Sequence, residues 1–325
     1  MGYSEILLPF IGGLGMFIYG MHTMAKGLED AAGAKVKNIL EALTKKPILG
    51  VLFGAVVTAL IQSSSATTVM VVGFVNAGVM NLYQAMSIIM GANIGTTVTG
   101  WIVSAGEWSK LLKPNTIAPL AIMLGVVFLL AGKRKILQEL AGITIGFGLL
   151  FVGIGMMSDA VAPLKEFVGF REAFLKLGGN PLLGIVAGAV VTAVIQSSSA
   201  SVGILQSLAA AGLVPFQTAV YIIMGQNIGT CITAMLSSIG TKENAKVAAL
   251  MHLLFNVIGT TIFGIGAILY FTGAKPAWGT LPITQTQIGI VHTVFNVATT
   301  ILLFPLSKRI IWLAKKMGSE KITPQ

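Results

Sequence analysis

Two polar strings each occur twice in this chain, and both have residue types that bind ions without carrying charge. QSSSA is found at Gln62–Ala66 and again at Gln196–Ala200, and NIGT at Asn93–Thr96 and Asn227–Thr230. Serine and threonine hydroxyls donate and accept hydrogen bonds, and asparagine and glutamine offer a carbonyl oxygen. Hydroxyls and helix-opening N–H groups bind oxyanions, while hard oxygen atoms bind sodium. The strings therefore predict a site for an anion and a cation.

Both strings belong to a long internal repeat. Pro47–Ala66 aligns with Pro181–Ala200, identical at 15 of 20 positions, and at the same shift Met86–Thr99 aligns with Val220–Thr233, identical at 9 of 14. Repeats that cover two halves of an apolar chain are typical of secondary transporters. Small polar residues also occur where membrane helices pack closely, but duplication of both strings at one spacing favours binding over packing.

The rest of the chain is apolar enough to lie in a lipid bilayer. Of its 325 residues, 55% are hydrophobic and 10% charged, against roughly 25% charged in soluble domains. The net charge of +10 comes mainly from Lys and Arg in short connections, as in membrane proteins that follow the positive-inside rule. No ionisable Asp, Glu, Lys, Arg or His occurs in 51–103 or 182–238. The sequence therefore predicts an all-α polytopic membrane protein with neutral binding groups.

Seven stretches are long enough to cross the hydrocarbon core, which takes about 20 helical residues. QSSS interrupts two others, at 47–77 and 181–211, and we expect each to be a re-entrant helical hairpin, because irregular backbone in a membrane must be enclosed by protein or water. Three crossings separate the copies, so the second copy is expected to be inverted. The seven predicted spans are Ile6–Leu28, Leu82–Val103, Thr116–Ala131, Ile136–Ala162, Phe216–Ser238, Ala245–Phe271 and Gln285–Pro305.

The distribution of basic residues orients this arrangement. Fourteen Lys and Arg residues fall on one side and six on the other, which predicts a cytoplasmic carboxyl terminus. The predicted parts are residues 1–134 as repeat 1 (hairpin 47–77, QSSS 62–65), residues 135–272 as inverted repeat 2 (hairpin 181–211, QSSS 196–199), and residues 273–325 as a final transmembrane helix and basic cytoplasmic tail.

Charged residues mix with apolar ones just before each hairpin. The segments Glu29–Lys46 and Pro163–Leu177 have this composition. They are either interfacial amphipathic helices or solvated connectors, and the pattern does not decide between the two.

Helix breaks determine the chemistry expected of each repeat. At QSSS, the N–H groups that open the next half-helix at Ala66 and Ala200 are predicted to be free for an oxyanion. At GxNIGT, a broken helix is predicted to free backbone carbonyls, which together with the glutamine side chains would coordinate sodium. A bound cation would offset the charge of the anion, which favours co-transport over movement of a bare anion.

Two further matching strings are HLLFN at His252–Asn256 and HTVFN at His292–Asn296. In each, a His and an Asn four residues apart share one helix face. A polar contact between helices and a functional site both fit this pattern, and the sequence leaves that choice open.

These strings resemble the type II sodium-dependent phosphate cotransporter family, in its shorter bacterial form. The resemblance covers roughly Pro47 to Asn256 and rests on QSSSATT, QSSSAS, IIMGANIGTT, IIMGQNIGTC and HLLFN. It implies inverted repeats with two re-entrant hairpins, inorganic phosphate as substrate, and sodium ions for coupling, with no other cofactor. Vertebrate members have an HxxFN string in the first repeat also, whereas Ala118–Ile122 is apolar here, so the number of coupled sodium ions stays open.

The resemblance also suggests which residues bind each ion. The candidate phosphate-binding residues are Gln62, Ser63, Ser64, Ser65, Asn93, Gln196, Ser197, Ser198, Ser199 and Asn227. The candidate sodium-binding residues are Gln62, Asn93, Thr96, Gln196, Ser197, Thr230, Thr233 and Asn256.

The sequence thus predicts a sodium-coupled symporter that imports inorganic phosphate across the cytoplasmic membrane by alternating access. The alternatives are a transporter of another oxyanion, such as sulfate or a small carboxylate, and a membrane receptor that binds phosphate without moving it. An enzyme is not expected, because the apolar segments have no paired carboxylates, phosphate loop or metal-ligand cluster. The expected partners are phosphate, sodium and the lipid bilayer, with a second copy of the chain possible and nucleic acid not expected.

Overall fold

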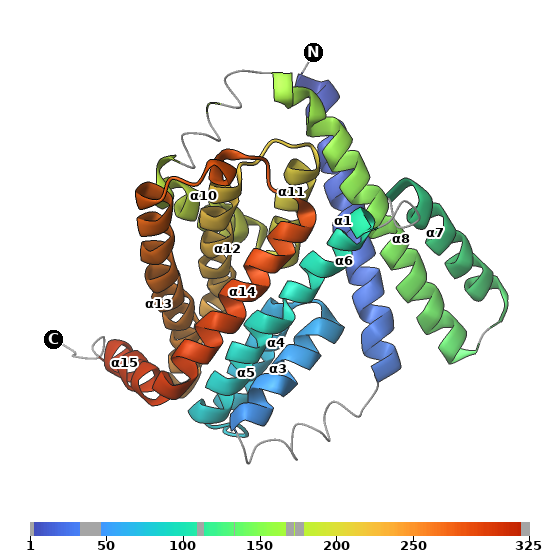
Figure 1. The fold of residues 1–325 in the computed structure, drawn as a ribbon. Helices are drawn as coiled ribbons and strands as arrows, with labels where there is room; N and C mark the ends of the chain where they lie inside the picture. The colour runs from blue at the N-terminus through green and yellow to red at the C-terminus, as the bar shows by residue number, and fades with distance from the viewer. Residues whose placement is uncertain are drawn as a thin grey trace.

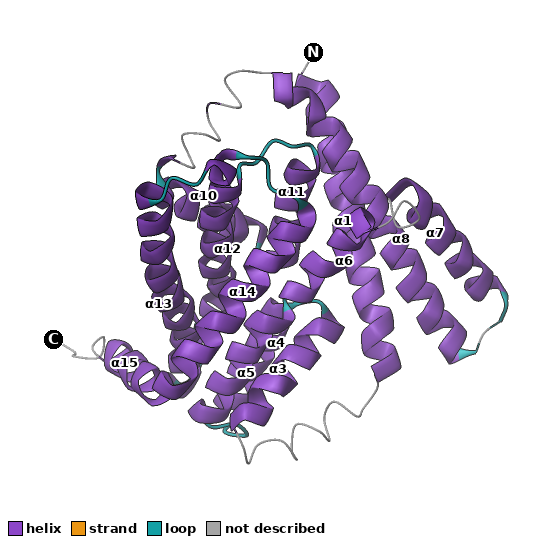
Figure 2. Cartoon of the chain, viewed as in Figure 1, coloured by secondary structure: helices purple, strands orange, loops and turns teal. Residues whose placement is uncertain are grey.

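The chain folds almost wholly into helices. The structure is a computed structural model and describes residues 3–32, 47–108, 114–132, 134–166, 172 and 179–319. Within these residues there is no strand (Figure 2), and one isolated bridge pairs Pro215 with Pro282. The helices are α1 (Tyr3–Ala32), α3 (Pro47–Ile61), α4 (Ser64–Asn76), α5 (Leu82–Gly95), α6 (Thr97–Trp108), α7 (Pro114–Leu130), α8 (Lys135–Val161), α10 (Pro181–Ile195), α11 (Ser198–Ala210), α12 (Phe216–Ser237), α13 (Glu243–Gly273), α14 (Gln285–Leu303) and α15 (Ser307–Ser319).

Six helical stretches among the described residues are long and apolar enough to cross a membrane. They are formed by α1, α5 with α6, α8, α12, α13, and α14 with α15. The seventh predicted span, from Thr116, falls in α7, an apolar helix of 17 residues, which is at the lower end of the length that a crossing takes. The chain turns after this helix at Gly132, where φ is 154°, before α8 begins.

Glycines let one arm of each hairpin lie directly against a long helix. A Cβ on Gly91 in α5 would lie 1.9 Å from the Val51 carbonyl oxygen in α3, and a Cβ on Gly225 in α12 would lie 1.9 Å from that of Ile185 in α10. Both approaches are possible only without a side chain. Because these pairs occupy equivalent positions of the two copies, the sequence repeat is also a repeat of packing.

The helices that open the two halves, α1 and α8, pack against each other along most of their length, and α7 packs on α8 (Figure 1). Gly13 lies against Gly153 and Gly20 against Gly146, so the two helices are antiparallel. When the two copies are aligned, Gly13 corresponds to Gly146 and Gly20 to Gly153. The contact of Gly13 with Gly153 is therefore equivalent to the contact of Gly146 with Gly20. This relation is the one expected between inverted copies of a unit.

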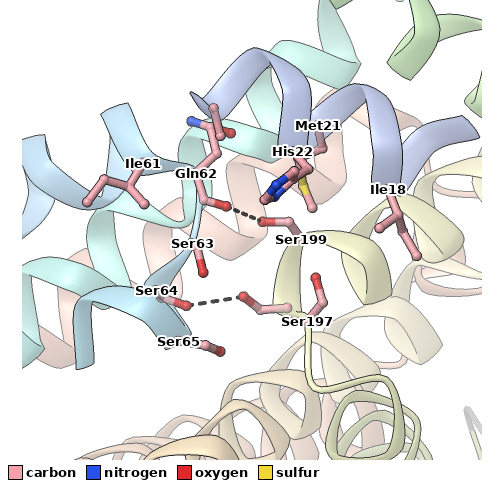
Figure 3. A pocket seen from close by; sticks show the side chains of 12 residues that line it. Ile18, Met21, His22, Ile61, Gln62, Ser63, Ser64, Ser65, Ser197 and Ser199 are labelled. Atoms are coloured by element: carbon pink, nitrogen blue, oxygen red, sulfur yellow. Dashed lines mark hydrogen bonds between the residues drawn. The ribbon is translucent and has the colours of Figure 1, made fainter. Parts of the chain in front are cut away.

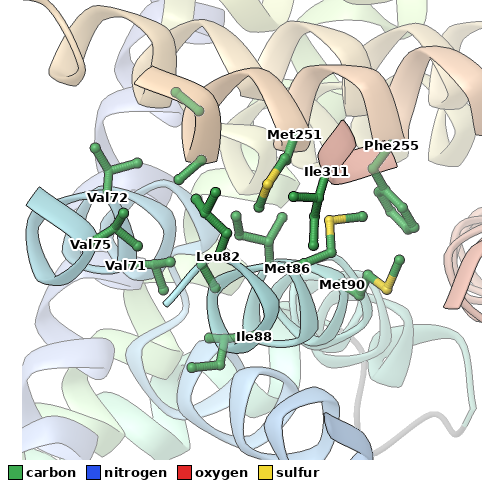
Figure 4. Close-up of a cluster of buried hydrophobic side chains, with 14 of the residues drawn as sticks. Val71, Val72, Val75, Leu82, Met86, Ile88, Met90, Met251, Phe255 and Ile311 are labelled. Atoms are coloured by element: carbon green, nitrogen blue, oxygen red, sulfur yellow. The ribbon is translucent and has the colours of Figure 1, made fainter. Parts of the chain in front are cut away.

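A buried apolar cluster joins α4 and α5 to α13 and α15 (Figure 4). Met86, Met251 and Phe255 are wholly buried in it. The basic segment after Pro305 contributes Ile311 to this cluster, because it folds as α15 and packs against α5 and α13.

The predicted helix break at GxNIGT is wrong for the second copy, where α12 runs through the string without interruption. In the first copy, Thr96 separates α5 from α6, yet its dihedral angles are helical and its N–H donates to the Ala92 carbonyl at 3.0 Å. The reason is local, because Asn93 and Asn227 donate to carbonyls four residues earlier, at 2.9 and 2.8 Å. Their amide N–H groups thus find acceptors without unwinding the helix.

The two predicted amphipathic segments fall mostly outside the described residues. Of the first, only its start at the end of α1 is described, and of the second, only a short 3-10 turn, Ala162–Glu166, and Glu172.

Glu107, near the end of α6, caps the start of α14. Its two carboxylate oxygens accept hydrogen bonds from the N–H groups of Gln285 and Thr286, each at 2.8 Å. These groups have no acceptor within their own helix and lie at the positive end of its dipole. Replacing Glu107 with alanine is therefore expected to destabilise the folded protein by about 1 kcal/mol, seen as a lower midpoint of thermal unfolding in detergent.

The control for this prediction is the same change at Glu243. That residue begins α13, but its side chain accepts no hydrogen bond from a described residue. An equal or larger loss at Glu243 would contradict a capping role for Glu107.

Candidate functional site

Both QSSS strings lie at a sharp break between two helices. Gln62 separates α3 from α4 with a φ of 54°, and Gln196 separates α10 from α11 with a φ of 56°. Non-glycine residues adopt this left-handed conformation in only a few per cent of cases. The predicted break at QSSS is thus present in both copies, and it turns the chain between the two arms of each hairpin.

The first serine of each string caps the helix that follows. The Ser63 hydroxyl oxygen accepts a hydrogen bond from the Ala66 N–H at 3.1 Å, and the Ser197 hydroxyl oxygen accepts one from the Ala200 N–H at 3.2 Å. The prediction that these N–H groups are free is therefore wrong, because a serine three residues earlier is a favourable N-cap. The N–H groups of the two serines after each cap have no acceptor within their helix.

A second hydroxyl contact joins the two arms of each hairpin. The Thr58 hydroxyl donates to the Thr67 hydroxyl at 2.9 Å, and at the equivalent positions Thr192 donates to Ser201 at 2.8 Å. All four residues are buried. Each hairpin is therefore fixed just behind its serines by the same pair of positions.

The tips of the two hairpins meet at equivalent serines. The hydroxyl oxygens of Ser64 and Ser198 are 3.2 Å apart (Figure 3). The hydroxyl oxygen of Thr96, from the first NIGT string, is also 3.2 Å from that of Ser198. Two loops from opposite halves of the sequence thus present their hydroxyls to one another.

A cavity of about 190 Å³ lies beside this contact. Water occupies about 30 Å³ per molecule in the liquid, so the cavity has room for a small oxyanion. The serine hydroxyls of both loops face this region (Figure 3). The lining residues are Ile18, Met21, His22, Ala25, Ile61, Gln62, Ser63, Ser64, Ser65, Ser197, Ser198 and Ser199.

Gln62 is held at one side of this cavity by hydroxyl groups from both copies. The Thr99 hydroxyl donates to the Gln62 side-chain carbonyl at 2.9 Å and lies 3.1 Å from the Ser199 hydroxyl. The Ser199 hydroxyl also donates to the Gln62 backbone carbonyl at 3.4 Å. Thr99 is not among the residues predicted for the site, although it lies one turn after Thr96 on the same helix face.

The equivalent residues of the second copy adopt a different arrangement. Gln196 is exposed, whereas Gln62 is only 3% exposed. Thr233, which corresponds to Thr99, has a buried hydroxyl with no hydrogen-bond partner among the described residues. Two loops with nearly the same sequence and the same backbone turn therefore differ in how their glutamine side chains are buried and bonded.

Several of the predicted site residues do not line the cavity. The Thr230 hydroxyl donates to the Gln226 carbonyl at 2.9 Å. The Asn256 amide donates to the His252 carbonyl at 3.0 Å and to the Cys231 sulfur at 3.3 Å, and its carbonyl oxygen is buried without a partner among the described residues. The predicted residues that do not line the cavity are Asn93, Thr96, Gln196, Asn227, Thr230, Thr233 and Asn256.

Sequence reasoning missed the contribution of α1 to the cavity wall. Ile18, Met21, His22 and Ala25 all come from this helix, which lies outside both hairpins. Among these four residues the signal in the sequence is His22, because an ionisable residue inside an apolar span is a functional candidate by default.

Comparison with known protein families gives one match that covers most of the chain. The Na+/Pi-cotransporter family matches residues 16–159 and 165–301. These two ranges contain both QSSS strings and both NIGT strings. No solved structure matches the chain.

Individual relatives differ in how much of their own length is matched. The chain is 31% identical over 303 residues to the uncharacterized protein YqeW of Bacillus subtilis, covering 93% of this chain and 95% of that protein. It is 30% identical over 302 residues to the putative inorganic phosphate export protein YjbB of Escherichia coli, covering 92% of this chain but 53% of that protein. It is 35% identical over 107 residues to the rat sodium-dependent phosphate transport protein 2A, covering 32% of this chain and 17% of that protein.

Proposed function

The chain belongs to the Na+/Pi-cotransporter family, and we therefore propose that it is a sodium-coupled symporter that imports inorganic phosphate by alternating access. The family resemblance drawn from the QSSS and NIGT strings is thereby confirmed, and members of this family are transporters rather than enzymes. The observation that carries the proposal is the meeting of Ser64 with Ser198 beside a cavity lined by six serines.

The proposed phosphate ligands are the serines of both loops. Their hydroxyls can donate to phosphate oxygens, and the helix-opening N–H groups of α4 and α11 add the positive end of two helix dipoles. Neutral donors bind the anion without requiring a buried cation. Gln62, which also lines the cavity, Gln196, Asn93 and Asn227 stay in the proposed set as amide donors around the two loops.

Buried side-chain oxygen atoms that have no hydrogen-bond partner in the described part of the chain support sodium binding in the second copy. Such atoms are found on Gln226, Thr233 and Asn256, in α12 and α13. A buried oxygen without a partner is costly, and sodium is bound by oxygens of this kind. The proposed sodium ligands are Gln196, Ser197, Thr230, Thr233 and Asn256, with Gln62, Asn93 and Thr96 as the equivalent set of the first copy.

The difference between the two copies supports alternating access. In this conformation Gln62 is bonded to Thr99 and buried, while Gln196 is exposed. If the copies are inverted, exchanging these two arrangements would close one side of the central site and open the other. The antiparallel contact of α1 with α8 supports such an inversion of residues 135–272 relative to 1–134.

A second candidate function is phosphate export. The Escherichia coli relative is named as a putative exporter, and the chain spans about half the length of that relative. The net direction of a symporter follows the sum of its ion gradients, so the same site can serve either direction. We favour import across the cytoplasmic membrane, with the carboxyl terminus in the cytoplasm, because cells keep sodium low inside.

The experiment is uptake of labelled phosphate by liposomes that contain the purified full-length chain. We expect accumulation under an inward sodium gradient and none under an equal potassium gradient. Unlabelled sulfate or a small carboxylate should not compete, and competition by either would indicate a different oxyanion cargo. Saturable phosphate binding without flux under any monovalent cation would contradict transport and indicate a receptor.

A further inference from the structure

His22 occupies a distinctive position in the serine cavity. It lies on α1, and it is the one ionisable residue among the twelve that line the cavity. Its ring lines the cavity together with Gln62 and Ser199 (Figure 3). The imidazole therefore belongs to a wall that neither hairpin provides.

The His22 side chain is exposed and lines the cavity, and it has no hydrogen-bond partner among the described residues. Its neighbours on α1, Met21 and Met24, are buried against the rest of the fold. An imidazole in an apolar span is unfavourable unless its polar atoms find a partner. Another methionine at this position would pack equally well, so a ligand that bonds to the imidazole better explains why a histidine is present.

No carboxylate of the described residues competes for this ring in the cavity. The hairpin helices that face it, α3, α4 and α11, have no charged residue. On α1 the nearest charge is Lys26, one turn away. On α8, Glu139 is paired with Lys135 at 3.6 Å and its backbone lies against Gly27 rather than beside His22.

We propose that His22 contacts the transported oxyanion by donating a hydrogen bond from its imidazole N–H. A tetrahedral oxyanion held by the two serine loops presents an oxygen toward α1, and His22 is the polar side chain of that wall. The inference depends on the proposed function only in taking phosphate as the anion. It makes α1 a third element of the binding site, besides the two hairpins.

Equilibrium binding of labelled phosphate to the purified full-length chain, at saturating sodium, tests the contact. We expect His22→Ala to weaken phosphate binding by about tenfold, as for the loss of one hydrogen bond to a charged group. His22→Gln keeps an N–H donor and should recover most of the affinity. The matched control is Thr23→Ala, since Thr23 donates to the Tyr19 carbonyl and does not line the cavity.

The contact is overturned if His22→Ala binds phosphate as tightly as Thr23→Ala does. It is also overturned if His22→Gln is as weak as His22→Ala, because the donor would then be irrelevant.

Chemical modification gives a second readout that a purely structural role would not change. Diethyl pyrocarbonate acylates accessible imidazoles, and mass spectrometry locates the product. His252 and His292 are 0% and 2% exposed and act as internal references. Phosphate should slow the modification of His22 and chloride should not, and equal rates in both salts would overturn the inference.

Neither readout depends on flux, so the two proposals fail separately. Phosphate protection of His22 without sodium-driven uptake would reject the symporter and keep the contact. Sodium-driven uptake without protection would reject the contact alone.

Discussion

Replacing Ser198 with alanine is expected to raise the phosphate concentration for half-maximal uptake by at least about tenfold. The Ser198 hydroxyl lies 3.2 Å from those of both Ser64 and Thr96, at the point where the two loops meet. Losing one hydrogen bond to a charged ligand costs about 1.5–3 kcal/mol, which corresponds to roughly 10- to 150-fold in affinity. Initial rates of sodium-dependent phosphate uptake, measured against phosphate concentration, give this value.

Ser64→Ala is expected to have a similar effect, and the double variant should lose less than the sum of the two. The reason is that the two hydroxyls contact each other, so each single change already disturbs the other side. The matched control is Ser207→Ala, because Ser207 is a buried serine of α11 that donates to the Ile204 carbonyl and does not line the cavity. Uptake by Ser198→Ala equal to that by Ser207→Ala would contradict a role in binding.

Replacing Gly225 with alanine is expected to be among the most destabilising single-methyl changes in the chain. The new Cβ would lie 1.9 Å from the Ile185 carbonyl oxygen, so α10 must move away from α12. Overpacking of this kind costs about 1–3 kcal/mol and occasionally more. Gly91→Ala creates the same clash with the Val51 carbonyl oxygen. Both variants should show a lower midpoint of thermal unfolding in detergent and a lower yield of folded protein.

The controls are Gly73→Ala and Gly266→Ala, in α4 and α13, where an added Cβ would meet nothing within 4 Å. Alanine is favoured over glycine within a helix by up to about 1 kcal/mol, so these variants should be as stable as the wild type or more so. A similar loss of stability at all four glycines would show that the close approach of the helices is not the cause.

The helix break at QSSS could be predicted from sequence because four consecutive polar residues interrupt an apolar run in both copies. The NIGT strings look similar in composition, yet their helix is not unwound. The amide N–H groups of Asn93 and Asn227 donate to backbone carbonyls one turn earlier. Composition alone does not predict these hydrogen bonds. For the same reason, composition did not predict that the N–H groups of Ala66 and Ala200 donate to the first serine of each string.

The wall formed by α1 could not be predicted from local pattern, because it depends on how that helix packs between distant segments. Only His22 departs from the apolar composition of that wall. The unequal burial of Gln62 and Gln196 could not be predicted either, since the sequences around them are nearly identical and the two loops share one backbone turn. Such a difference is decided by the conformation of the whole protein and not by the repeat itself.

The number of phosphate ions bound per chain tests most directly whether the two serine loops form one site. Equilibrium dialysis of the purified full-length protein with labelled phosphate, at saturating sodium, measures it. One phosphate per chain is expected, and Ser64→Ala and Ser198→Ala should each weaken that same site. Two phosphates per chain, one of them lost with each substitution, would contradict a shared site.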